Sequence, residues 1–227
     1  SIIRGYAERL ILKLEEKDVR RGDAEKIKRH LDRISKLIRQ LLIFARHSPL
    51  KPQEIQVNEI IRSVAEMLEP ELQTARIDTT LDLQENLPML WADPDQLYQV
   101  FFNIVVNAKQ AMQETGGRLI ITSGFYLANP RNSSTDLQPF PSNPEPADFL
   151  RLEFSDTGSG IQPNHIKRIF DPFFTTKDVG EGSGLGLAIC HGIVTEHGGW
   201  IEVESKLYEG SSFQVILPFN RNGKRYE

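Results

Sequence analysis

The stretch from Gly180 to Cys190, GEGSGLGLAIC, carries four glycines within seven residues and runs into an apolar segment. Backbone N–H groups at the first turn of a helix bind anions, and glycines let a phosphate approach them closely. No Lys follows as in a Walker loop, and the spacing Gly182-x-Gly184-x-Gly186 differs from the dinucleotide-binding pattern. The stretch predicts a phosphate site of another kind, with a ligand-free glycine-rich turn as the alternative.

Asn103 and Asn107 lie one helical turn apart, and Gln110 continues the same face. The residues around them are almost all apolar, which predicts a mostly buried helix. Burying a carboxamide without a partner costs ~1–3 kcal/mol, so other protein groups or a ligand must satisfy these side chains. An amide oxygen is a hard ligand that suits Mg²⁺, which usually keeps waters and substrate phosphates in its shell.

Asp156, Gly158 and Gly160 form the pattern DTGSG directly after the strand-like segment LRLEFS. An ionised aspartate only accepts hydrogen bonds, which suits an exocyclic amino group such as that of adenine. The two glycines let the backbone approach a flat ring. Taken alone, the pattern is equally typical of an Asx-type turn without a ligand.

Composition narrows the class of protein. The 227 residues are 39% hydrophobic and 26% charged, which is ordinary for a globular protein, and the net charge of −4 argues against a nucleic-acid binder. The single cysteine excludes an intrachain disulfide and fits a reducing, cytoplasmic compartment. No apolar run reaches the ~18 residues of a membrane span, so no membrane contact is expected of this segment. The abrupt start predicts that the chain is a piece of a longer protein, in which a membrane anchor would lie outside these residues.

Residues 1–48 differ from the rest by a heptad-like apolar pattern. Two amphipathic helices are expected, joined by a turn at Gly22–Asp23 with Asp23 capping the second helix. We expect this hairpin to pair with a second copy into a homodimeric four-helix bundle. The alternative is that its apolar stripe packs on the chain's own second domain. The stripe consists of Ile3, Ala7, Leu10 and Leu14, then Ile27, Leu31, Ile34, Ile38, Leu41 and Ala45.

After a proline-containing linker at 49–56, helices and strands alternate over 57–220. Helices are expected over 57–68, from Asp93–Pro94 to a Gly-Gly stop, and over 183–197. Strands are expected at 76–83, 118–126, 149–158, 200–206 and 211–219. This order predicts an α/β sandwich, with one helical layer on a mixed sheet. Residues 127–148, rich in Pro, Ser and Asn, form a long connection that is either disordered or a family-specific insertion.

Four motifs together resemble, in order and spacing, the conserved boxes of the sensor histidine kinases. They are NIVVNAKQA (103–111), DTGSG (156–160), FDPFFTTK (170–177) and GSGLGL (182–187). The first 48 residues resemble the dimerisation hairpin of these kinases, and nitrogen-regulator-type sensors are the most similar. The resemblance implies the Bergerat ATP-binding fold, with ATP and Mg²⁺ as cofactors and a response-regulator receiver domain as partner.

The resemblance also implies residue roles. Asn107 would hold Mg²⁺ with support from Asn103, and Asp156 would accept from adenine with Ser211 backing it through its hydroxyl or water. Phe170 and Phe173 would anchor a mobile lid, which carries Lys177 to the phosphates. Plain packing is the alternative for Phe173 and Phe174. The complete expected ATP site is Asn103, Asn107, Gln110, Asp156, Gly158, Gly160, Phe170, Thr175, Thr176, Lys177, Gly182, Ser183, Gly184, Leu185, Gly186 and Ser211.

Two departures from the family pattern matter. Many relatives carry Lys where this chain has Gln110, and Lys109 is expected to lie off the ligand face, so charge neutralisation falls on Lys177 and Mg²⁺. The phosphoacceptor His box is absent, so we expect ATP binding without autophosphorylation. The histidines, all expected to be surface or packing residues, are His30, His47, His165, His191 and His197.

The leading hypothesis is the ATP-binding core of a two-component sensor kinase, which passes the γ-phosphoryl group of ATP to a histidine and then to a response-regulator aspartate. An ATPase of the same fold, of the gyrase, mismatch-repair or chaperone type, is the first alternative. Such enzymes carry Glu at the place of Asn103, and a carboxamide has no useful basicity. A non-catalytic dimeric nucleotide-binding scaffold is the second alternative.

Overall fold

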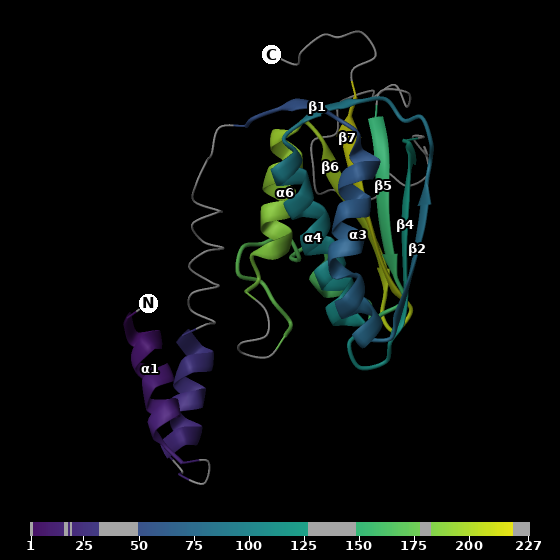
Figure 1. The fold of residues 1–227 in the computed structure, drawn as a ribbon. Helices are drawn as coiled ribbons and strands as arrows, with labels where there is room; N and C mark the ends of the chain where they lie inside the picture. Colours follow the sequence, from purple (N-terminus) through teal and green to yellow (C-terminus); the bar gives the residue numbers. More distant parts are fainter. Residues whose placement is uncertain are drawn as a thin grey trace.

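The structure, a computed structural model, describes residues 2–15, 18, 20–31, 50–126, 149–177 and 183–219. The predictions for Gly182, for His47, for the second half of the heptad stripe and for the segment 127–148 lie outside these residues. Figure 1 shows a pair of helices near the N-terminus and an α/β unit whose helices cover one face of a sheet. Among the described helices, none is both long and apolar enough to cross a membrane.

The N-terminal pair consists of α1 (Ile2–Lys13) and a second helix of which residues 20–31 are described. Small residues lie in the pair's buried part, since Ala7 and Ala24 are each 3% exposed. An ion pair joins Lys28 Nζ and Glu8 Oε1 at 3.7 Å. Pairing with a second copy stays a prediction. Large apolar side chains of these helices that remain exposed are Ile3, Tyr6, Leu10, Leu12 and Ile27.

The predicted turn at Gly22–Asp23 is wrong, because both residues lie inside the helical range 20–31. Asp18 takes the capping role that the sequence assigned to Asp23. Its Oδ1 accepts the backbone N–H of Arg20 at 2.8 Å, and its side chain also pairs with the Arg20 guanidinium. Asp and Asn cap helices wherever the first free N–H groups lie within reach, so the earlier aspartate starts the helix sooner.

The α/β unit contains a five-stranded sheet in the order β2-β4-β5-β7-β6. The β2–β4 pair is parallel and the other pairs are antiparallel, which confirms the predicted mixed sheet. The residues 127–148 connect β4 and β5, which are neighbours as the sequence predicted. The strands are β2 (Ile77–Leu83), β4 (Gly117–Phe125), β5 (Phe149–Asp156), β6 (Trp200–Lys206) and β7 (Gly210–Pro218).

Three long helices form the single layer on this sheet: α3 (Val57–Thr74), α4 (Pro94–Ala111) and α6 (Gly186–Glu196). Alternation along β5 turns Leu150, Leu152 and Phe154 to the buried side. The Phe154 ring meets Phe101 of α4 with centroids 5.5 Å apart. The layer therefore fixes α4 against the central strands, which is where the Asn-bearing helix must be held.

Two boundaries differ from the sequence prediction. Helix α3 continues past 68 to Thr74 and includes Pro70, which is exposed, so the carbonyl that loses its N–H partner is on the solvent side. Part of the expected linker is a strand, β1 (Gln53–Ile55), which pairs antiparallel with β3 (Leu90–Ala92). Three-residue strands give too little alternation to be recognised in the sequence.

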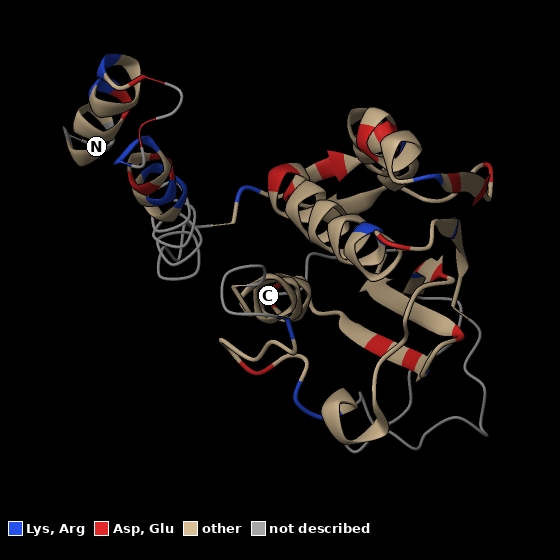
Figure 2. Cartoon of the chain, turned by 90° about the horizontal axis from the view of Figure 1, so that it is seen from below, with Lys and Arg blue, Asp and Glu red and all other residues tan. Residues whose placement is uncertain are grey.

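Charge is unevenly distributed over these two parts. Figure 2 shows basic and acidic positions close together on the N-terminal helices, while strands of the sheet carry acidic positions. Glu202 and Glu204 of β6 are examples. Mixed signs on the helical pair are typical of a solvated helix face rather than of a phosphate-backbone groove.

Candidate nucleotide-binding site

A cavity of about 510 Å³ lies where α4, the turn after β5 and the start of α6 meet. It brings together residues from five separate stretches of the sequence, which is typical of a ligand site in an α/β fold. Twelve of the sixteen predicted site residues line it: Asn103, Asn107, Gln110, Asp156, Gly160, Thr175, Thr176, Lys177, Ser183, Gly184, Gly186 and Ser211.

Helix α4 supplies the amide side chains. Asp93 and Pro94 start this helix, and the Asp93 Oδ1 accepts the N–H groups of Asp95 and Gln96. Near the middle of the helix, Asn103 Nδ2 donates a long hydrogen bond of 3.4 Å to the Gly186 carbonyl, and its side chain also hydrogen-bonds the Cys190 thiol. Asn107 is half-buried, and no hydrogen bond joins its side chain to another residue that the structure describes. Its carboxamide therefore faces the cavity with its hydrogen-bonding groups available.

The two lysines near this end point to different partners. Lys109 Nζ pairs with the Glu71 carboxylate of α3, on the side away from the cavity, as the sequence analysis expected. Lys177 comes from the segment before α6, and its Nζ donates to Gln110 Oε1. The structure therefore places a cation beside Gln110, although the residue at that position is itself uncharged.

Asp156 ends β5 and is 7% exposed. Burial raises the pKa of its carboxyl above the ordinary 3.8, and the backbone N–H groups of Gly158 and Ser211 act in the opposite direction. Gly158 donates to Asp156 Oδ1 at 2.8 Å. Ser211 supports Asp156 through its backbone N–H, while its hydroxyl lies 3.0 Å from the Ser205 hydroxyl and makes no direct hydrogen bond to Asp156; support through water stays a prediction.

The structure gives a different reason for the presence of glycine at each of three predicted site positions. Gly184 has φ +65°, and a Cβ there would come within 2.4 Å of the Phe173 backbone carbon. A Cβ at Gly158 would lie 2.7 Å from Ala111 Cβ, so this glycine packs the DTGSG turn on α4 and does not line the cavity. At Gly186, by contrast, the nearest atom is Asn103 Cγ at 3.9 Å. The protein itself would accept a methyl group at Gly186, and the space it would fill belongs to the cavity.

The start of α6 differs from the predicted helix 183–197. The helix begins at Gly186, and Leu185 occupies the capping position without a side-chain hydrogen bond to the first turn. Leu185 is 1% exposed and belongs to the core, so its side chain does not reach the cavity. Ser183 lines the cavity, and its Oγ accepts the Leu185 N–H at 3.3 Å. The uncapped first turn leaves backbone N–H groups beside the cavity, as an anion site requires.

Phe173 does not anchor the lid by its side chain, because that side chain is 64% exposed. Its backbone instead connects this segment to the turn before α6, since Phe173 N–H donates to the Gly184 carbonyl at 2.9 Å. Phe170 packs on the core and its ring lies 5.3 Å from that of His191, so it supports the segment without lining the cavity. Phe174 both packs on the core and lines the cavity.

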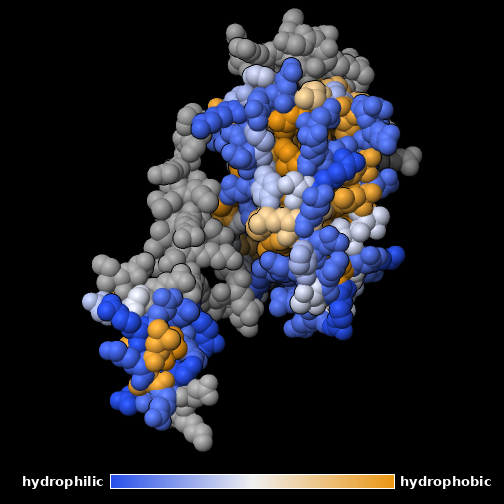
Figure 3. Space-filling view, in the orientation of Figure 1, coloured by the Kyte–Doolittle hydropathy of each residue, from blue (hydrophilic) through white to orange (hydrophobic). Residues whose placement is uncertain are grey.

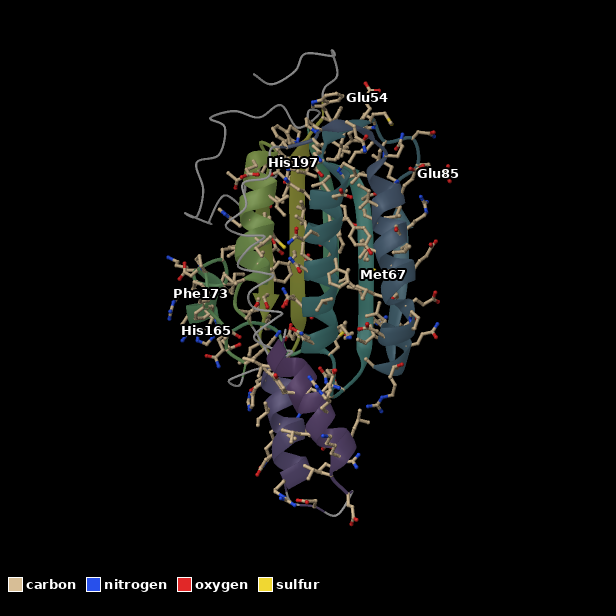
Figure 4. The ribbon with its side chains drawn as sticks, turned by 60° about the vertical axis from the view of Figure 1, so that its left-hand side comes forward. Glu54, Met67, Glu85, His165, Phe173 and His197 are labelled. Atoms are coloured by element: carbon tan, nitrogen blue, oxygen red, sulfur yellow. The ribbon has the colours of Figure 1, made fainter. Side chains whose placement is uncertain are left out.

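The N-terminal end of α4 contains a junction that the sequence did not reveal. Asp93 Oδ2 accepts the Lys51 backbone N–H at 3.0 Å, just before β1. The Asp93 N–H donates to His197 Nε2 at 3.0 Å, and His197 Nδ1 lies 2.8 Å from the Ile193 carbonyl. This geometry makes Nδ1 the protonated nitrogen. Figure 4 places His197 at the end of α6 that lies away from His165 and Phe173.

Some cavity residues were not anticipated. His165 was expected to be a surface or packing residue, yet it lines the cavity from α5 (Pro163–Ile166). The sequence held one signal, since Ile161, His165 and Ile169 are spaced by four residues and all line the cavity. The turn between β6 and β7 adds Leu207 and Tyr208, which no local pattern places there.

The donor set fits a magnesium–nucleotide complex. Among the described residues, no group of three or more His, Cys, Asp or Glu side chains could hold a metal ion by itself. A cation here would depend on the Asn107 amide oxygen and on oxygens that a nucleotide brings, which is the usual way that Mg²⁺ is held. Asp156 supplies a buried acceptor and the α6 start supplies N–H donors.

Comparison with known proteins gives consistent matches. Residues 92–221 match the family model described as Histidine kinase-, DNA gyrase B-, and HSP90-like ATPase. The chain is 36% identical over 196 residues to the sensor kinase CckA of Brucella abortus (strain 2308), covering 86% of this chain and 20% of CckA. It is 32% identical over 226 residues to the signal transduction histidine-protein kinase AtoS of Escherichia coli (strain K12), covering 99% and 33%. The chain thus spans a fifth to a third of these relatives.

Solved structures agree with the fold. Full-length ShkA in complex with AMPPNP matches with a TM-score of 0.71 and 25% identity, over 96% of this chain and 42% of that one. The histidine kinase ThkA in complex with the response regulator protein TrrA matches with a TM-score of 0.69 and 26% identity, over 98% and 58%. Since the family model spans more than half of this sequence and the named relatives are sensor kinases, the chain belongs to the histidine kinase-, DNA gyrase B- and HSP90-like ATPase family, as the catalytic domain of a sensor histidine kinase.

Proposed function

We propose that this chain is the ATP-binding kinase core of a two-component system, which donates the γ-phosphoryl group of ATP to a protein histidine. The observation that carries the proposal is a cavity shared by the buried Asp156, the uncapped start of α6 and the Asn107 amide, which no described side chain or backbone group hydrogen-bonds. From the histidine, the group would pass to an aspartate of a response regulator. The 227 residues contain no phosphoacceptor box, so the activity test below provides the acceptor histidine on a separate domain.

Each residue of the proposed site has a role that follows from the chemistry of its side chain. Asp156 accepts from the adenine amino group, and its two backbone donors hold the carboxylate in orientation. Asn107 would hold Mg²⁺, which would neutralise phosphate charge, and Lys177 adds a positive charge at the same end. Catalysis of phosphoryl transfer is mainly positioning and electrostatic stabilisation, so no covalent intermediate on these residues is required.

Hydrolysis is the weaker alternative for this site. An ATPase needs a group that activates water, and a carboxylate at the position of Asn103 would serve. Asn103 instead carries an amide that donates toward the Gly186 carbonyl and has no useful basicity. We therefore expect nucleotide to be bound and retained until an acceptor histidine is presented.

We also propose that the chain forms a homodimer through its N-terminal helices, works in the cytoplasm and contacts a response-regulator receiver domain. The support for dimerisation is the exposed apolar set on these helices, of which Ile3, Leu10 and Ile27 are 59%, 50% and 49% exposed. Figure 3 shows an apolar patch on this helical part, ringed by hydrophilic residues. Light scattering after size exclusion should give twice the chain mass, and Leu10→Glu should reduce it to the chain mass.

Calorimetric titration with ATP, with and without Mg²⁺, tests the nucleotide site. We expect binding that strengthens with Mg²⁺, and Asp156→Asn should weaken it by at least about tenfold, because one carboxylate oxygen becomes a donor. The activity is tested with radiolabelled ATP and a separate dimerisation domain that carries an intact acceptor histidine. Label on that histidine supports the kinase, release of phosphate without label supports the ATPase, and absence of ATP binding supports a scaffold.

A further inference from the structure

His165 lies in a stretch of the cavity lining that also contains Ile161, Gln162 and Ile169. Ile161, His165 and Ile169 follow each other at intervals of four residues, along α5 and its two flanks, and all three line the cavity. Ile169 is 7% exposed and packs in the core, while Ile161 and His165 are half-buried. This stretch thus combines two isoleucines with two polar side chains, Gln162 at its start and the His165 imidazole in its middle.

Aromatic packing holds this imidazole in place. The His165 ring meets the Phe174 ring at a centroid distance of 5.5 Å and an angle of 65°, an edge-to-face contact. The Arg168 guanidinium lies 4.5 Å from the centroid of the same Phe174 ring, and Phe174 also packs against the core. Figure 4 shows His165 close to Phe173, in the segment that precedes α6. The ring of His165 is therefore positioned by residues of the predicted lid.

The imidazole nitrogens of His165 have no hydrogen-bond partner among the described residues, although the ring is half-buried. His197 shows the contrast, because both of its nitrogens are used, one by the Ile193 carbonyl and one by the Asp93 N–H. A neutral imidazole offers one donor and one acceptor. His165 lines the cavity and no described residue uses its donor or its acceptor, so the ring is available to a polar group of a ligand.

Within the cavity lining, His165 is connected through the chain to the adenine end of the proposed nucleotide site and through the Phe174 ring to its phosphate end. On one side, Ile161 follows the DTGSG turn of Asp156, and its N–H is held by Ser205 Oγ at 2.8 Å. On the other side, the packing partner Phe174 directly precedes the segment from Thr175 to Lys177. In a nucleotide, the ribose separates the base from the phosphates.

From this placement we propose that His165 hydrogen-bonds a ribose hydroxyl of the bound nucleotide and makes the site prefer ribonucleotides to deoxyribonucleotides. The proposal rests on the nucleotide-binding function proposed above. A neutral hydrogen bond with such a hydroxyl corresponds to an affinity difference of about three- to tenfold. Removal of either partner, the hydroxyl or the imidazole, should produce the same loss.

The test is a calorimetric cycle with ATP, 2′-deoxy-ATP and 3′-deoxy-ATP against the wild type and His165→Phe. We expect the wild type to bind at least one deoxy analogue about three- to tenfold more weakly than ATP. The His165→Phe variant should bind ATP only as tightly as the wild type binds that analogue. Its preference for ATP over the deoxy analogue should therefore disappear. His191→Phe is the matched control, since His191 is half-buried against Phe170 and does not line the cavity; it should keep the preference.

The outcomes separate the two proposals. His165→Phe could lower the affinities for ATP and for both analogues by the same factor, or it could leave the preference for ATP over the analogues unchanged. Either result would show that the hydrogen bond does not exist and would overturn the inference. If the wild type binds no ATP at all, the nucleotide site itself is wrong. Thermal unfolding of each variant shows whether it is folded, and His165→Leu provides the same test if the Phe variant is unstable.

Discussion

The two ends of helix α4 differ in whether other protein groups satisfy the hydrogen-bonding capacity of their polar side chains. At the first end, the Asp93 carboxylate accepts the N–H groups of Asp95, Gln96 and Lys51, at 3.0 to 3.2 Å. Its own N–H donates to His197. Towards the second end, Asn107 has no protein partner among the described residues, while Asn103 makes a long contact of 3.4 Å to the Gly186 carbonyl and a hydrogen bond to the Cys190 thiol.

This difference separates stability from binding within one helix. A polar group that the protein itself satisfies contributes to folding, and its loss leaves unpaired donors. A half-buried carboxamide without a protein partner contributes little to folding and remains available to a ligand. Mutations at the two ends should therefore affect different measurements, and the following experiments are chosen to break or to sharpen that contrast.

Asp93→Ala should give the largest effect on stability, because the helix start and the Lys51 N–H lose their acceptor together. We expect the free energy of unfolding in urea to fall by about 1–3 kcal/mol. ATP affinity of the folded protein should change by less than about twofold, since Asp93 lies outside the cavity lining. Asp93→Asn keeps one capping oxygen and should lose less. If Asp93→Ala left the free energy of unfolding unchanged but abolished ATP binding, the N-terminal end of α4 would serve nucleotide binding rather than stability.

Asn107→Ala should act on binding alone. We expect the Mg²⁺-dependent part of ATP affinity to fall by about tenfold or more, with the free energy of unfolding within about 0.5 kcal/mol of the wild type. Lys109→Ala is the control on the same helix, because Lys109 pairs with Glu71 away from the cavity. An Asn107→Ala protein that keeps its full Mg²⁺ response would contradict the metal assignment.

Gly186→Ala extends the comparison to α6. The new methyl group would meet no protein atom closer than 3.9 Å, so folding should be unimpaired, whereas nucleotide affinity should fall by about three- to tenfold through lost space. Gly192→Ala serves as the control, because Gly192 lies in the same helix but outside the cavity lining. A Cβ added at Gly192 would also meet no neighbouring atom within 4 Å. The Gly192→Ala variant should keep its ATP affinity, and a loss equal to that of Gly186→Ala would show that helix flexibility matters instead.

The pH dependence of the free energy of unfolding that comes from Asp156 should be the smallest of these effects. Burial raises the pKa of Asp156 above 3.8, so the folded state binds this proton more tightly than the unfolded state does. The stability contributed by this group is present below pH 3.8 and is lost as pH rises through the folded pKa. Urea titrations of wild type and Asp156→Asn over this range should show that the wild type loses stability relative to the variant as pH rises. A constant difference would mean that the carboxyl is not desolvated.

Local sequence signals were sufficient for much of the scaffold. Asp93–Pro94 predicted the start of α4, and the spacing of Asn103 and Asn107 predicted their shared face. These features depend on hydrogen bonds and side-chain directions within one or two helical turns, which the sequence encodes directly. The same reasoning failed at Asp23, because Asp18 offered an equally good cap earlier in the chain.

The N-terminal helices show a limit of another kind. Their heptad pattern predicts an apolar stripe, and the described part of it does contain exposed Ile3, Leu10 and Ile27. The identity of the surface that covers the stripe depends on another segment or copy, so periodicity alone does not decide it. Pairing of these helices therefore belongs to the proposals.

The sequence by itself determined the α/β class, the helix that carries the carboxamides and the set of motifs that mark the family. The tertiary structure alone decided the contacts between distant segments. His197 reaches Asp93 across 104 positions of the chain, and Ser211 lies opposite Asp156 in the sheet. It also separated Gly184, required by the Phe173 backbone, from Gly186, which keeps the cavity open. Such roles depend on which atoms approach in space, and spacing along a chain does not specify that approach.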